Sequence, residues 1–474
     1  MPSRNILTLI NKIMSKKEGE KIKKPPQLLR GMKDVLPDEQ KYWSFITETV
    51  IKMAETYGFS RIDTPILEEN SLFVRSVGKD TDVVEKEMYT FEDRSGDLIA
   101  MRPEGTAGVV RAYLEHGMLS WPQPVKLYYI GPFFRYDRPQ AGRFRQFHQF
   151  GFEVLGDNHP VIDAQLMMMS YRLYADMGVP VTLQVNSIGC PGCRPDYLKA
   201  LTEYYRSRRN VLCEDCKRRL TKNPLRLLDC KEKDCQLLLQ DAPQTVDFLC
   251  ENCNSHFIKV LENLDGLDIP YILNARLVRG LDYYSNTAFE LWPLLANEPQ
   301  DSGGTVEEAS QSGRQNAMGG GGRYDYLAKQ LGGQHTPAIG FASGLERLIV
   351  ELKERDIKVG EKVLPDVFVA QLGDSARKKA LKLFEDLRGE GIKVAESFSK
   401  DGLKNQMEMA NKKGVKYALI IGQKELMDDT ILIRDMENGI QETVDSQKII
   451  PEIRKRLEKN GVVAKNGQYG SFHL

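Results

Sequence analysis

The segment from residue 128 to residue 156 has the pattern of an antiparallel hairpin. An apolar and aromatic run, 128–134, is followed by a polar segment with proline and glycine, 138–142, and then by alternating apolar and polar residues. In the returning half, Gln149 and Glu153 fall on the same face, because successive side chains of a strand point to opposite faces. The pattern therefore predicts two strands joined by a turn.

Arginines distinguish this hairpin from an ordinary one. Arg135 ends the first expected strand, and Arg138, Arg143 and Arg145 lie around the turn. A guanidinium group within a sheet is costly unless an anion pairs with it, and its planar fork suits phosphate and carboxylate groups. This segment alone leaves two interpretations open: an anion-binding surface, or a solvated sheet edge protected by charges.

The length and composition indicate a globular protein of several domains. At 474 residues the chain exceeds one ordinary hydrophobic core, which predicts two or three domains. No apolar run approaches the roughly 18 residues of a membrane span, so no membrane partner is expected. Basic and acidic residues are equal at 66 each, and any nucleic acid would therefore meet a local basic patch.

Three segments are expected to lie outside the packed domains. Residues 1–26 are basic and lack the apolar core of a secretory signal, which favours a disordered basic arm and a cytoplasmic location. Residues 297–315 are rich in Ser, Gly, Gln and Glu and are expected to form a flexible surface loop. Residues 460–474 are expected to form a loose tail.

All eight cysteines lie between residues 190 and 253, and six of them form three C-x-x-C pairs. In a reducing compartment this spacing favours zinc over disulfides, and two tetrahedral sites would use all eight. The alternative is a set of reduced, partly buried cysteines, because sequence cannot show that the pairs converge. Zinc therefore stays an open possibility. The candidate ligands are Cys190, Cys193, Cys213, Cys216, Cys230, Cys235, Cys250 and Cys253.

The segments before the hairpin predict a mixture of helices and strands. A helical period covers residues 38–57, a strand is expected at 59–67, and a helix at 107–115. Glu104 and Thr106 stand just before the last of these helices. Taken by themselves, Thr106 is expected to be its N-cap and Glu104 a solvated acid.

Residues 189–265 are mostly helical in pattern and are expected to form an insertion within the first domain. Their first half is rich in lysine and arginine, which fits either a contact to a phosphate backbone or a solvated helical face. Beyond the insertion, the glycine run 319–322 would let a backbone approach a ligand closely. Arg347 follows near the start of a helix, where anions bind readily.

The pattern changes after residue 352. Residues 353–365 are charged and indicate a linker between domains. From 366 to 459 strands and helices alternate, which predicts a small, independent α/β domain.

Taken together, residues 27–459 resemble the histidyl-tRNA synthetases, a family of class II aminoacyl-tRNA synthetases. Two stretches match histidine-specific signatures: 277–284 (LVRGLDYY) and 321–325 (GGRYD). Three class II motifs also occur in order: a long helix with its following strand, the hairpin, and a strand followed by glycine and a helix. They contain Pro65, Phe134-Arg135 and Gly344-Leu345-Glu346-Arg347.

The resemblance implies an α+β fold. Residues 27–352 would form a class II synthetase catalytic domain on an antiparallel sheet, with a Cys-rich helical insertion at 189–265. The linker 353–365 would lead to an α/β anticodon-binding domain at 366–459, and the protein would be a homodimer. The implied reaction uses ATP and Mg²⁺ to convert L-histidine to histidyl-adenylate, and the histidyl group then passes to tRNA(His).

The resemblance also implies roles for three arginines. Arg135 would hold the α-phosphate and the attacking carboxylate, Arg279 would approach the α-phosphate from the other side, and Arg347 would bind the terminal phosphates with Mg²⁺. Bringing two anions together needs positive charge and positioning, and no side-chain nucleophile.

The histidine substrate is expected to be held at both ends. Glu104, Thr106 and Gln149 would surround its α-ammonium group. Glu153 and Tyr284 would reach the two imidazole nitrogens, which would reject apolar analogues. The full expected set of histidine-binding residues is Glu104, Thr106, Gln149, Glu153, Tyr283, Tyr284 and Tyr324.

Three further residues of the hairpin are also assigned roles. Arg138 and Gln140 match positions that meet the acceptor end of tRNA, with solvation of the turn as the alternative. His148 is expected to be structural, since the chemistry needs no acid or base there.

Two other functions fit parts of the sequence. Catalytically inactive paralogues of this fold regulate histidine biosynthesis, but they typically lack the arginine signature and the C-terminal domain that this chain has. A general nucleic-acid-binding protein with a vestigial ATP fold would leave the histidine-specific residues unexplained.

Overall fold

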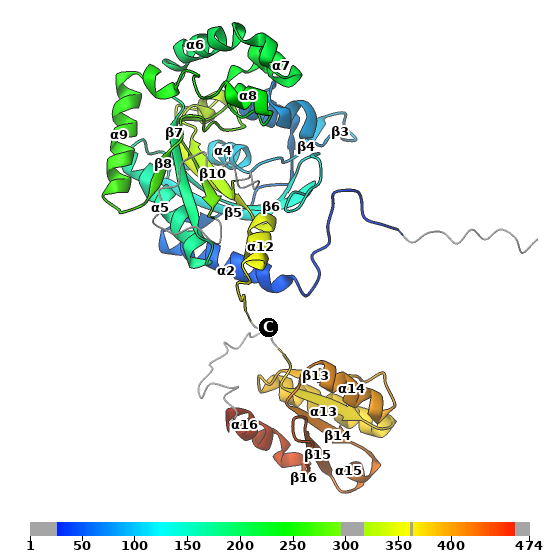
Figure 1. The fold of residues 1–474 in the computed structure, drawn as a ribbon. Helices are drawn as coiled ribbons and strands as arrows, with labels where there is room; N and C mark the ends of the chain where they lie inside the picture. Colours follow the sequence, from blue (N-terminus) through cyan, green and yellow to red (C-terminus); the bar gives the residue numbers. More distant parts are fainter. Residues whose placement is uncertain (1–25, 295–316, 361–363, 460–474) are drawn as a thin grey trace, which may run out of the picture. The chain divides into compact units, whose positions relative to one another are not determined.

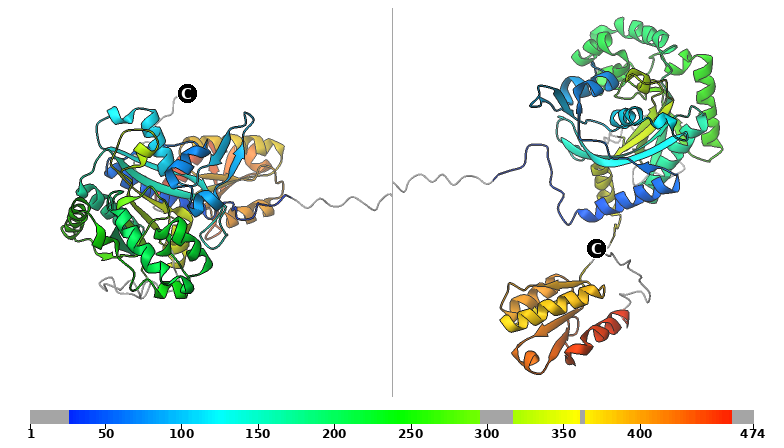
Figure 2. Two further views of the ribbon diagram at one scale, coloured as in Figure 1. Left: turned by 90° about the horizontal axis from the view of Figure 1, so that it is seen from above. Right: turned by 180° about the vertical axis from the view of Figure 1, so that it is seen from behind.

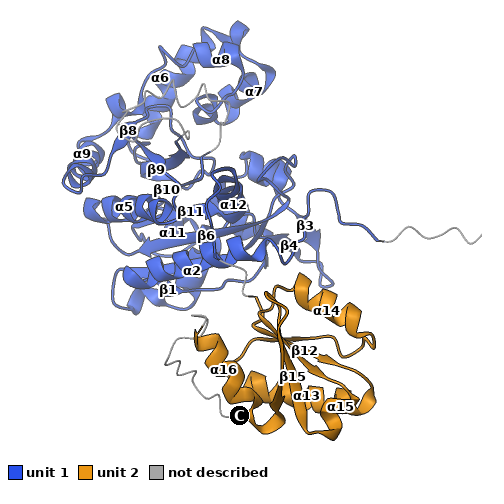
Figure 3. Ribbon diagram, turned by 60° about the horizontal axis from the view of Figure 1, so that its bottom comes forward, with its two compact units in different colours: residues 1–360 blue, residues 361–474 orange. Residues whose placement is uncertain are grey.

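The computed structural model describes residues 26–294, 317–360 and 364–459. The chain divides into two compact units, residues 1–360 and 361–474 (Figure 3). Nearly all of the expected basic arm, the 297–315 loop and the tail lie outside the described residues. Within the described ranges, no helix is long and apolar enough to cross a membrane.

An eight-stranded sheet, with strand order β1-β5-β6-β11-β10-β9-β7-β8, forms the centre of the first unit (Figure 1). The strands from β5 through β7 in this order pair antiparallel, and only the edge strands β1 and β8 pair parallel. The expected antiparallel sheet is therefore confirmed. The strands are β1 (Ser60–Arg61), β5 (Val125–Phe134), β6 (Gln146–Leu155), β7 (Val181–Ser187), β8 (Tyr271–Leu273), β9 (Ser285–Pro293), β10 (Gly319–Arg323) and β11 (Ala338–Gly344).

The predicted hairpin is present as β5 and β6, with Gly131 opposite Gln149 and Phe134 opposite Gln146. Both strands lie inside the sheet, so the interpretation of a solvated sheet edge is wrong. Phe150 and Phe152 are buried on the helix-covered face of the sheet. Glu153 points to the opposite face and is only 1% exposed.

Four helices cover one face of this sheet in a shared hydrophobic core. In the first of them Ile46, Val50, Met53 and Ala54 are buried, which is the spacing of one helical face. The four are α2 (Gln40–Thr56), α5 (Pro160–Asp176), α9 (Glu251–Asp265) and α12 (Leu345–Glu354). The other face packs against α4 (Thr106–Glu115) and α11 (Leu327–Gln330) in a second core, which contains several of the expected site residues.

The prediction of one strand over residues 59–67 is wrong, because this segment is divided. Its start pairs with β5 as β1, whereas its last residue begins β2, which belongs to a separate three-stranded sheet. Pro65 lies between the two strands and has no N–H to donate to a ladder. The smaller elements of this region are β2 (Leu67–Glu69), α3 (Asn70–Val77), the π-helical turn η1 (Val83–Glu87), β3 (Thr90–Glu92), β4 (Leu98–Met101) and the 3₁₀ turn η2 (Met118–Ser120).

The Cys-rich segment is helical, as expected, and has a small core of its own. Figures 1 and 2 show its helices, in green, as a separate group beside the large sheet. Several of its cations pair with acids: Arg219 and Arg226 approach Asp82, and Lys222 approaches Glu85. Besides α9, it contains α6 (Arg194–Arg206), η3 (Arg209–Val211), α7 (Glu214–Lys222), η4 (Pro224–Leu227), α8 (Lys233–Leu237) and η5 (Thr245–Phe248).

The second unit is built on a five-stranded sheet with strand order β13-β12-β14-β15-β16. Two cores lie on its two faces, one with α13 and α16 and the other with α14. The short helix α15 (Gln423–Met427) was not predicted. The strands are β12 (Val367–Gln371), β13 (Val394–Glu396), β14 (Tyr417–Ile421), β15 (Thr430–Asp435) and β16 (Gln441–Asp445), and the longer helices are α13 (Asp374–Gly389), α14 (Leu403–Lys412) and α16 (Ile449–Lys459), preceded by η6 (Ser446–Lys448).

Candidate active site

A cleft of about 1140 Å³ opens in the first unit between the large sheet and the insertion. Arg135, Arg279 and Arg347 all line it, although they come from three distant parts of the chain. They stand at the end of β5, before β9, and in the first turn of α12. The cleft therefore gathers the three guanidinium groups that the sequence singles out.

Two of these arginines have no acidic partner among the described residues. Arg135 donates from Nε to the carbonyl of Pro103 at 2.8 Å, and Arg347 donates from Nη1 to the carbonyl of Ala317 at 2.6 Å. Burial lowers the pKa of Arg347, and the like charges of Arg143 and Arg135 lower it further. Guanidinium groups that repel one another in a partly buried cleft leave a site suited to an anion.

Arg279 is placed differently, because it forms an ion pair with Glu290 of β9. Its guanidinium lies 5.5 Å from the centre of the Tyr284 ring. The glycine run is strand β10, and a Cβ atom on Gly320 would overlap Arg279. These glycines therefore make room for other atoms of the protein, and because Gly319 and Gly320 also line the cleft, the expected close approach of a ligand stays a prediction.

Most of the expected histidine-binding residues form a buried network. It lies on the face of the large sheet opposite α2, α5, α9 and α12. Glu153 accepts hydrogen bonds from the Thr106 hydroxyl at 2.8 Å and the Tyr324 hydroxyl at 2.6 Å. The Tyr283 hydroxyl donates to Glu104 at 3.2 Å. Six of the seven expected residues, Glu104, Thr106, Glu153, Tyr283, Tyr284 and Tyr324, are buried, and Gln149 lines the neighbouring cleft.

The pKa values of the two carboxyl groups in this network are both raised. Burial raises the pKa of Glu153 to about 8, although hydrogen bonds from Tyr324 and Thr106 oppose the rise. Burial also raises the pKa of Glu104, against the backbone N–H groups that it accepts from. Neither carboxyl forms an ion pair with a lysine or arginine in the described parts of the chain. A cationic ligand would meet this need.

The expectation that Thr106 caps helix α4 is wrong. Thr106 is the first helical residue and Gly105 is the N-cap. The capping group is the carboxylate of Glu104, which accepts the backbone N–H groups of Thr106 and Ala107, each at 2.8 Å. Glu104 is only 5% exposed, so it is not a solvated acid. A carboxylate at a helix start is favourable because the free N–H groups point toward it.

Sequence reasoning missed Tyr129 of β5. Its ring is buried, and its hydroxyl has no hydrogen-bond partner among the residues that the structure describes. Burial and the charges of Glu153 and Glu104 raise its pKa. A Cβ atom on Gly105 or Gly151 would overlap the Tyr129 ring. The residue lies in an aromatic run, and nothing local marks its hydroxyl as a neighbour of Glu104 and Glu153.

Arg323 of β10 was not among the expected site residues, although it supports one of them. Its side chain is fully buried and pairs with Asp163 at 2.6 Å and Asp325 at 3.2 Å. His256 contacts the same Asp163 carboxylate at 3.3 Å. Tyr324 follows Arg323 directly and donates to Glu153. The ion pairs of Arg323 therefore hold the end of β10 from which Tyr324 reaches Glu153. In the sequence, the GGRYD signature was the signal that could have drawn attention to Arg323.

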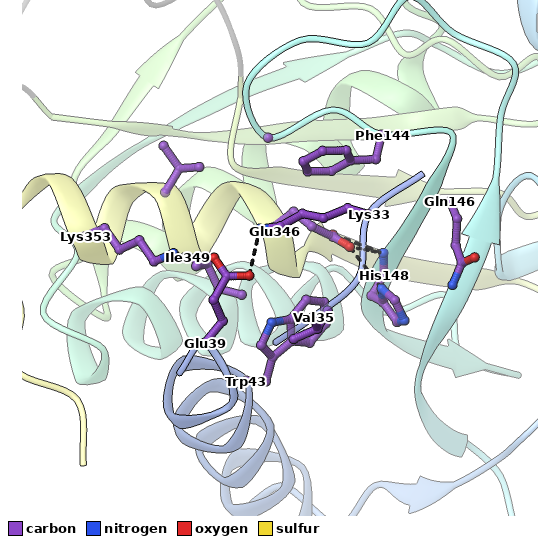
Figure 4. Close-up of a pocket in the computed structure, with 12 residues that line it drawn as sticks. Lys33, Val35, Glu39, Trp43, Phe144, Gln146, His148, Glu346, Ile349 and Lys353 are labelled. Carbon is purple, nitrogen blue, oxygen red and sulfur yellow. Dashed lines mark hydrogen bonds and ion pairs between the residues drawn. The ribbon is translucent and has the colours of Figure 1, made fainter. Parts of the chain in front are cut away.

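The remaining hairpin residues lie away from the histidine network. Arg138 and Gln140 are exposed in the loop between β5 and β6. His148 donates its backbone N–H to Glu346 at 2.9 Å, its ring Nδ1 contacts the same carboxylate, and its ring packs edge-on against Trp43 (Figure 4). These groups surround a cavity of only about 70 Å³. The contacts fit the structural role expected for His148.

The eight cysteines gather into two groups of four. Cys190, Cys193, Cys250 and Cys253 form one group, and Cys213, Cys216, Cys230 and Cys235 form the other. Within each group the sulfur atoms all lie within 4.8 Å of one another. The convergence that sequence could not show is therefore present in the fold.

Comparison with known proteins places the chain in a family. The family model of histidyl-tRNA synthetase matches residues 31–201, and that of the anticodon-binding domain matches residues 366–456. A histidine–tRNA ligase of Dehalococcoides mccartyi is 46% identical over 90% of this chain and 99% of that protein. One of Pelotomaculum thermopropionicum is 45% identical over 90% of this chain and 97% of that protein.

Comparison with solved structures gives the same family. The apo histidyl-tRNA synthetase of S. aureus has a TM-score of 0.72 and 35% identity, covering 91% of this chain and 100% of that chain. A histidyl-tRNA synthetase from Nostoc, at 20% identity and a TM-score of 0.59 over 91% of this chain and 100% of that one, shares the fold. The resemblance seen in the sequence is confirmed, and the chain belongs to the histidyl-tRNA synthetase family.

Proposed function

We propose that this chain is a cytoplasmic histidine–tRNA ligase that works through an ATP-dependent histidyl-adenylate intermediate. Family membership supports the charging of tRNA with histidine. One observation carries the finer proposal: three guanidinium groups line a cleft near a buried network whose two carboxyl groups have no lysine or arginine partner among the described residues. Phosphates and a cationic amino acid are complementary to these two halves.

In the first step, a carboxylate oxygen of histidine attacks the α-phosphorus of ATP, and pyrophosphate leaves. We assign Arg135 and Arg279 to the α-phosphate and the attacking carboxylate, and Arg347 to the terminal phosphates. Mg²⁺ would neutralise phosphate charge, and Glu290 in the cleft wall is an oxygen ligand that fits it. In the second step, a ribose hydroxyl of the tRNA attacks the activated carbonyl, and AMP leaves.

Recognition of histidine is assigned to the buried network. Glu104, with Gln149 nearby, would receive the α-ammonium group. Glu153 and the Tyr284 hydroxyl would pair with the two imidazole nitrogens. The contacts to Thr106 and Tyr324 hold the Glu153 carboxyl in one orientation, so they would position it for the ring. Tyr283 would orient Glu104 in the same way.

The second unit is proposed to bind the anticodon region of tRNA(His), because residues 366–456 match the anticodon-binding domain. Arg138 and Gln140 are proposed to meet the acceptor end, since both are exposed in the loop between β5 and β6. The two contacts would then act on one tRNA through linked units, which raises affinity well above that of either alone.

Deletion of residues 361–474 is expected to separate these functions. Histidine-dependent exchange of pyrophosphate into ATP should stay within about threefold of the full chain, because the first unit has its own core and cleft. Aminoacylation of tRNA(His) should fall by about 10²-fold or more, since one of two linked contacts is lost. A thermal melt would show that the shortened chain is folded, and equal losses in both reactions would contradict the division of roles.

A homodimer is proposed because the three-stranded sheet of β2, β3 and β4 exposes apolar side chains. Leu67 and Phe91 are 49% and 44% exposed, and both lie on the face that carries Ile99 and Met101. Light scattering on the purified chain should give twice the mass of 53.8 kDa. Leu67→Lys with Phe91→Lys should shift the mass toward one chain, whereas the exposed Leu381→Lys should not. A wild-type monomer at micromolar concentration would contradict the proposal.

The proposed overall reaction is tested by charging a tRNA(His) transcript. Histidyl-tRNA should form only when histidine, ATP and Mg²⁺ are all present, and AMP should appear in equal amount. Formation of ADP in place of AMP would contradict the adenylate route. Binding of histidine without any charging would favour a regulatory paralogue.

A further inference from the structure

The two cysteine groups are built from residues that are distant in the chain. In the first quartet, Cys190 and Cys193 stand between β7 and α6, and Cys250 and Cys253 stand at the start of α9. In the second quartet, Cys213 and Cys216 stand at the start of α7, and the other two stand around α8. Five of the eight thiols are buried, namely Cys193, Cys216, Cys230, Cys235 and Cys253.

The spacing of the sulfur atoms is that of a metal site. A tetrahedral zinc with Zn–S bonds of about 2.3 Å separates its ligand sulfurs by about 3.8 Å. The observed separations are 3.7 Å for Cys190 and Cys193, 3.9 Å for Cys193 and Cys253, and 3.8 Å for Cys213 and Cys230. A disulfide needs about 2.05 Å, and all eight cysteines are free.

The surroundings of both quartets suit thiolates. Backbone N–H groups point at the sulfurs, from Gly192 to Cys190 at 3.3 Å and from Cys216 to Cys213 at 3.4 Å. Four thiolates around Zn²⁺ carry a net charge of −2, which a nearby cation stabilises. Arg194 follows Cys193 directly in the chain, and Arg219 lies one helical turn after Cys216.

We propose that the chain binds two zinc ions, one in each quartet, as structural sites of the insertion. The first ion would link the cysteines before α6 to the cysteines at the start of α9, and would thus hold together the two ends of segment 194–249. It would also fix Arg194, which donates to the carbonyl of Tyr284 in the histidine pocket at 2.6 Å. Structural zinc sites of this kind are closed, with four protein ligands and no open position for substrate.

The second ion would stiffen a wall of the cleft. Cys213 and Cys230 line the cleft together with Arg219 and Arg226. Both arginines face Asp82, at 3.5 and 3.4 Å, which connects this wall to the turn at η1. The effect on the cleft rests on the proposed function, but the binding of zinc does not.

The test is a metal count on the full chain, purified without a metal-binding tag and in the absence of chelators. Elemental analysis should give two zinc per chain. A mercurial reagent should release both ions to a chromogenic chelator as the thiols react. Cobalt grown into the protein should show the charge-transfer and d–d absorption of tetrahedral thiolate sites. None of these measurements depends on catalytic activity, so they stand even if the proposed function fails.

Each quartet serves as the control for the other. Cys253→Ser should leave one zinc per chain, Cys230→Ser should also leave one, and the double variant should leave none. Less than half an equivalent of zinc in the wild-type chain would overturn the proposal, as would stoichiometric iron. One zinc in the wild-type chain would overturn the two-site assignment. If the variants fail to fold, the wild-type count decides by itself.

Discussion

Replacement of Arg279 by alanine is expected to slow adenylate formation by about 10³-fold. The guanidinium lines the cleft with Arg135 and Arg347, where phosphate charge would develop. Its removal also takes away the ion-pair partner of the half-buried Glu290, so the cleft loses one positive charge that would offset the phosphates. Histidine affinity should fall far less than the rate, because Arg279 lies beside the network only at the Tyr284 ring, and Glu104 and Glu153 keep their own contacts. Rapid-quench kinetics measures the first quantity, and calorimetry measures the second.

One further variant separates charge from geometry in this experiment, and a second serves as the control. Arg279→Lys keeps the charge but loses the planar fork, so its rate should lie between those of the wild type and the alanine variant. Arg388→Ala removes an exposed arginine of α13 in the other unit and should have no effect. An Arg279→Ala rate within about threefold of the wild type would show that this arginine does not hold the reacting phosphate.

Replacement of Glu153 by glutamine is expected to raise the KM for histidine by about 10²-fold. The carboxyl is 1% exposed and held by Thr106 and Tyr324. Glutamine keeps the shape but cannot carry the charge or accept at both positions, so an imidazole nitrogen would lose its partner. The kcat at saturating histidine should fall much less, because Glu153 does not contact the phosphates.

The same carboxyl predicts a window of pH for histidine binding. Within its buried network Glu153 has a pKa of about 8, and free imidazole has a pKa of about 6.5. If the complex holds one proton between the two groups, binding needs no proton change from pH 6.5 to 8. Histidine must lose a proton below this window, and Glu153 must gain one above it. Affinity should therefore fall about tenfold per pH unit on either side.

Glu153→Gln should remove the decline above pH 8 and keep the decline below pH 6.5, which calorimetry over a pH series would show. Glu385→Gln, on the exposed face of α13, is the matched control and should keep both limbs. A variant that retains the upper limb would assign that limb to another group.

Local patterns in the sequence predicted much of the fold. The period of Ile46, Val50 and Met53 predicted helix α2, and the alternation after Gln149 predicted strand β6. The strands and the longer helices of the second unit were predicted in order, because apolar runs mark buried strands such as β12 and β14 and helical periods mark the helices between them. Division of the 59–67 strand was not predicted, since its two ends pair with different sheets.

The site depended on contacts between distant residues, and there the sequence was less informative. Glu104 was predicted to be a solvated acid because its hydrogen-bond partner Tyr283 lies 179 positions further along the chain, where no local pattern connects the two. The cysteines could not be grouped, since Cys193 meets Cys253 across 60 positions. Tyr129 was missed because its environment is made by Glu104 and Glu153, on other elements. Family signatures supplied the arginines, which no local pattern would have joined.

The central claim is that one cleft holds ATP against the carboxylate of histidine. Exchange of labelled pyrophosphate into ATP, measured with each of the common amino acids and no tRNA, tests it most directly. Exchange should depend on histidine and should be at background with the other amino acids. Exchange at background with histidine as well, in a folded protein that still binds histidine, would contradict the claim.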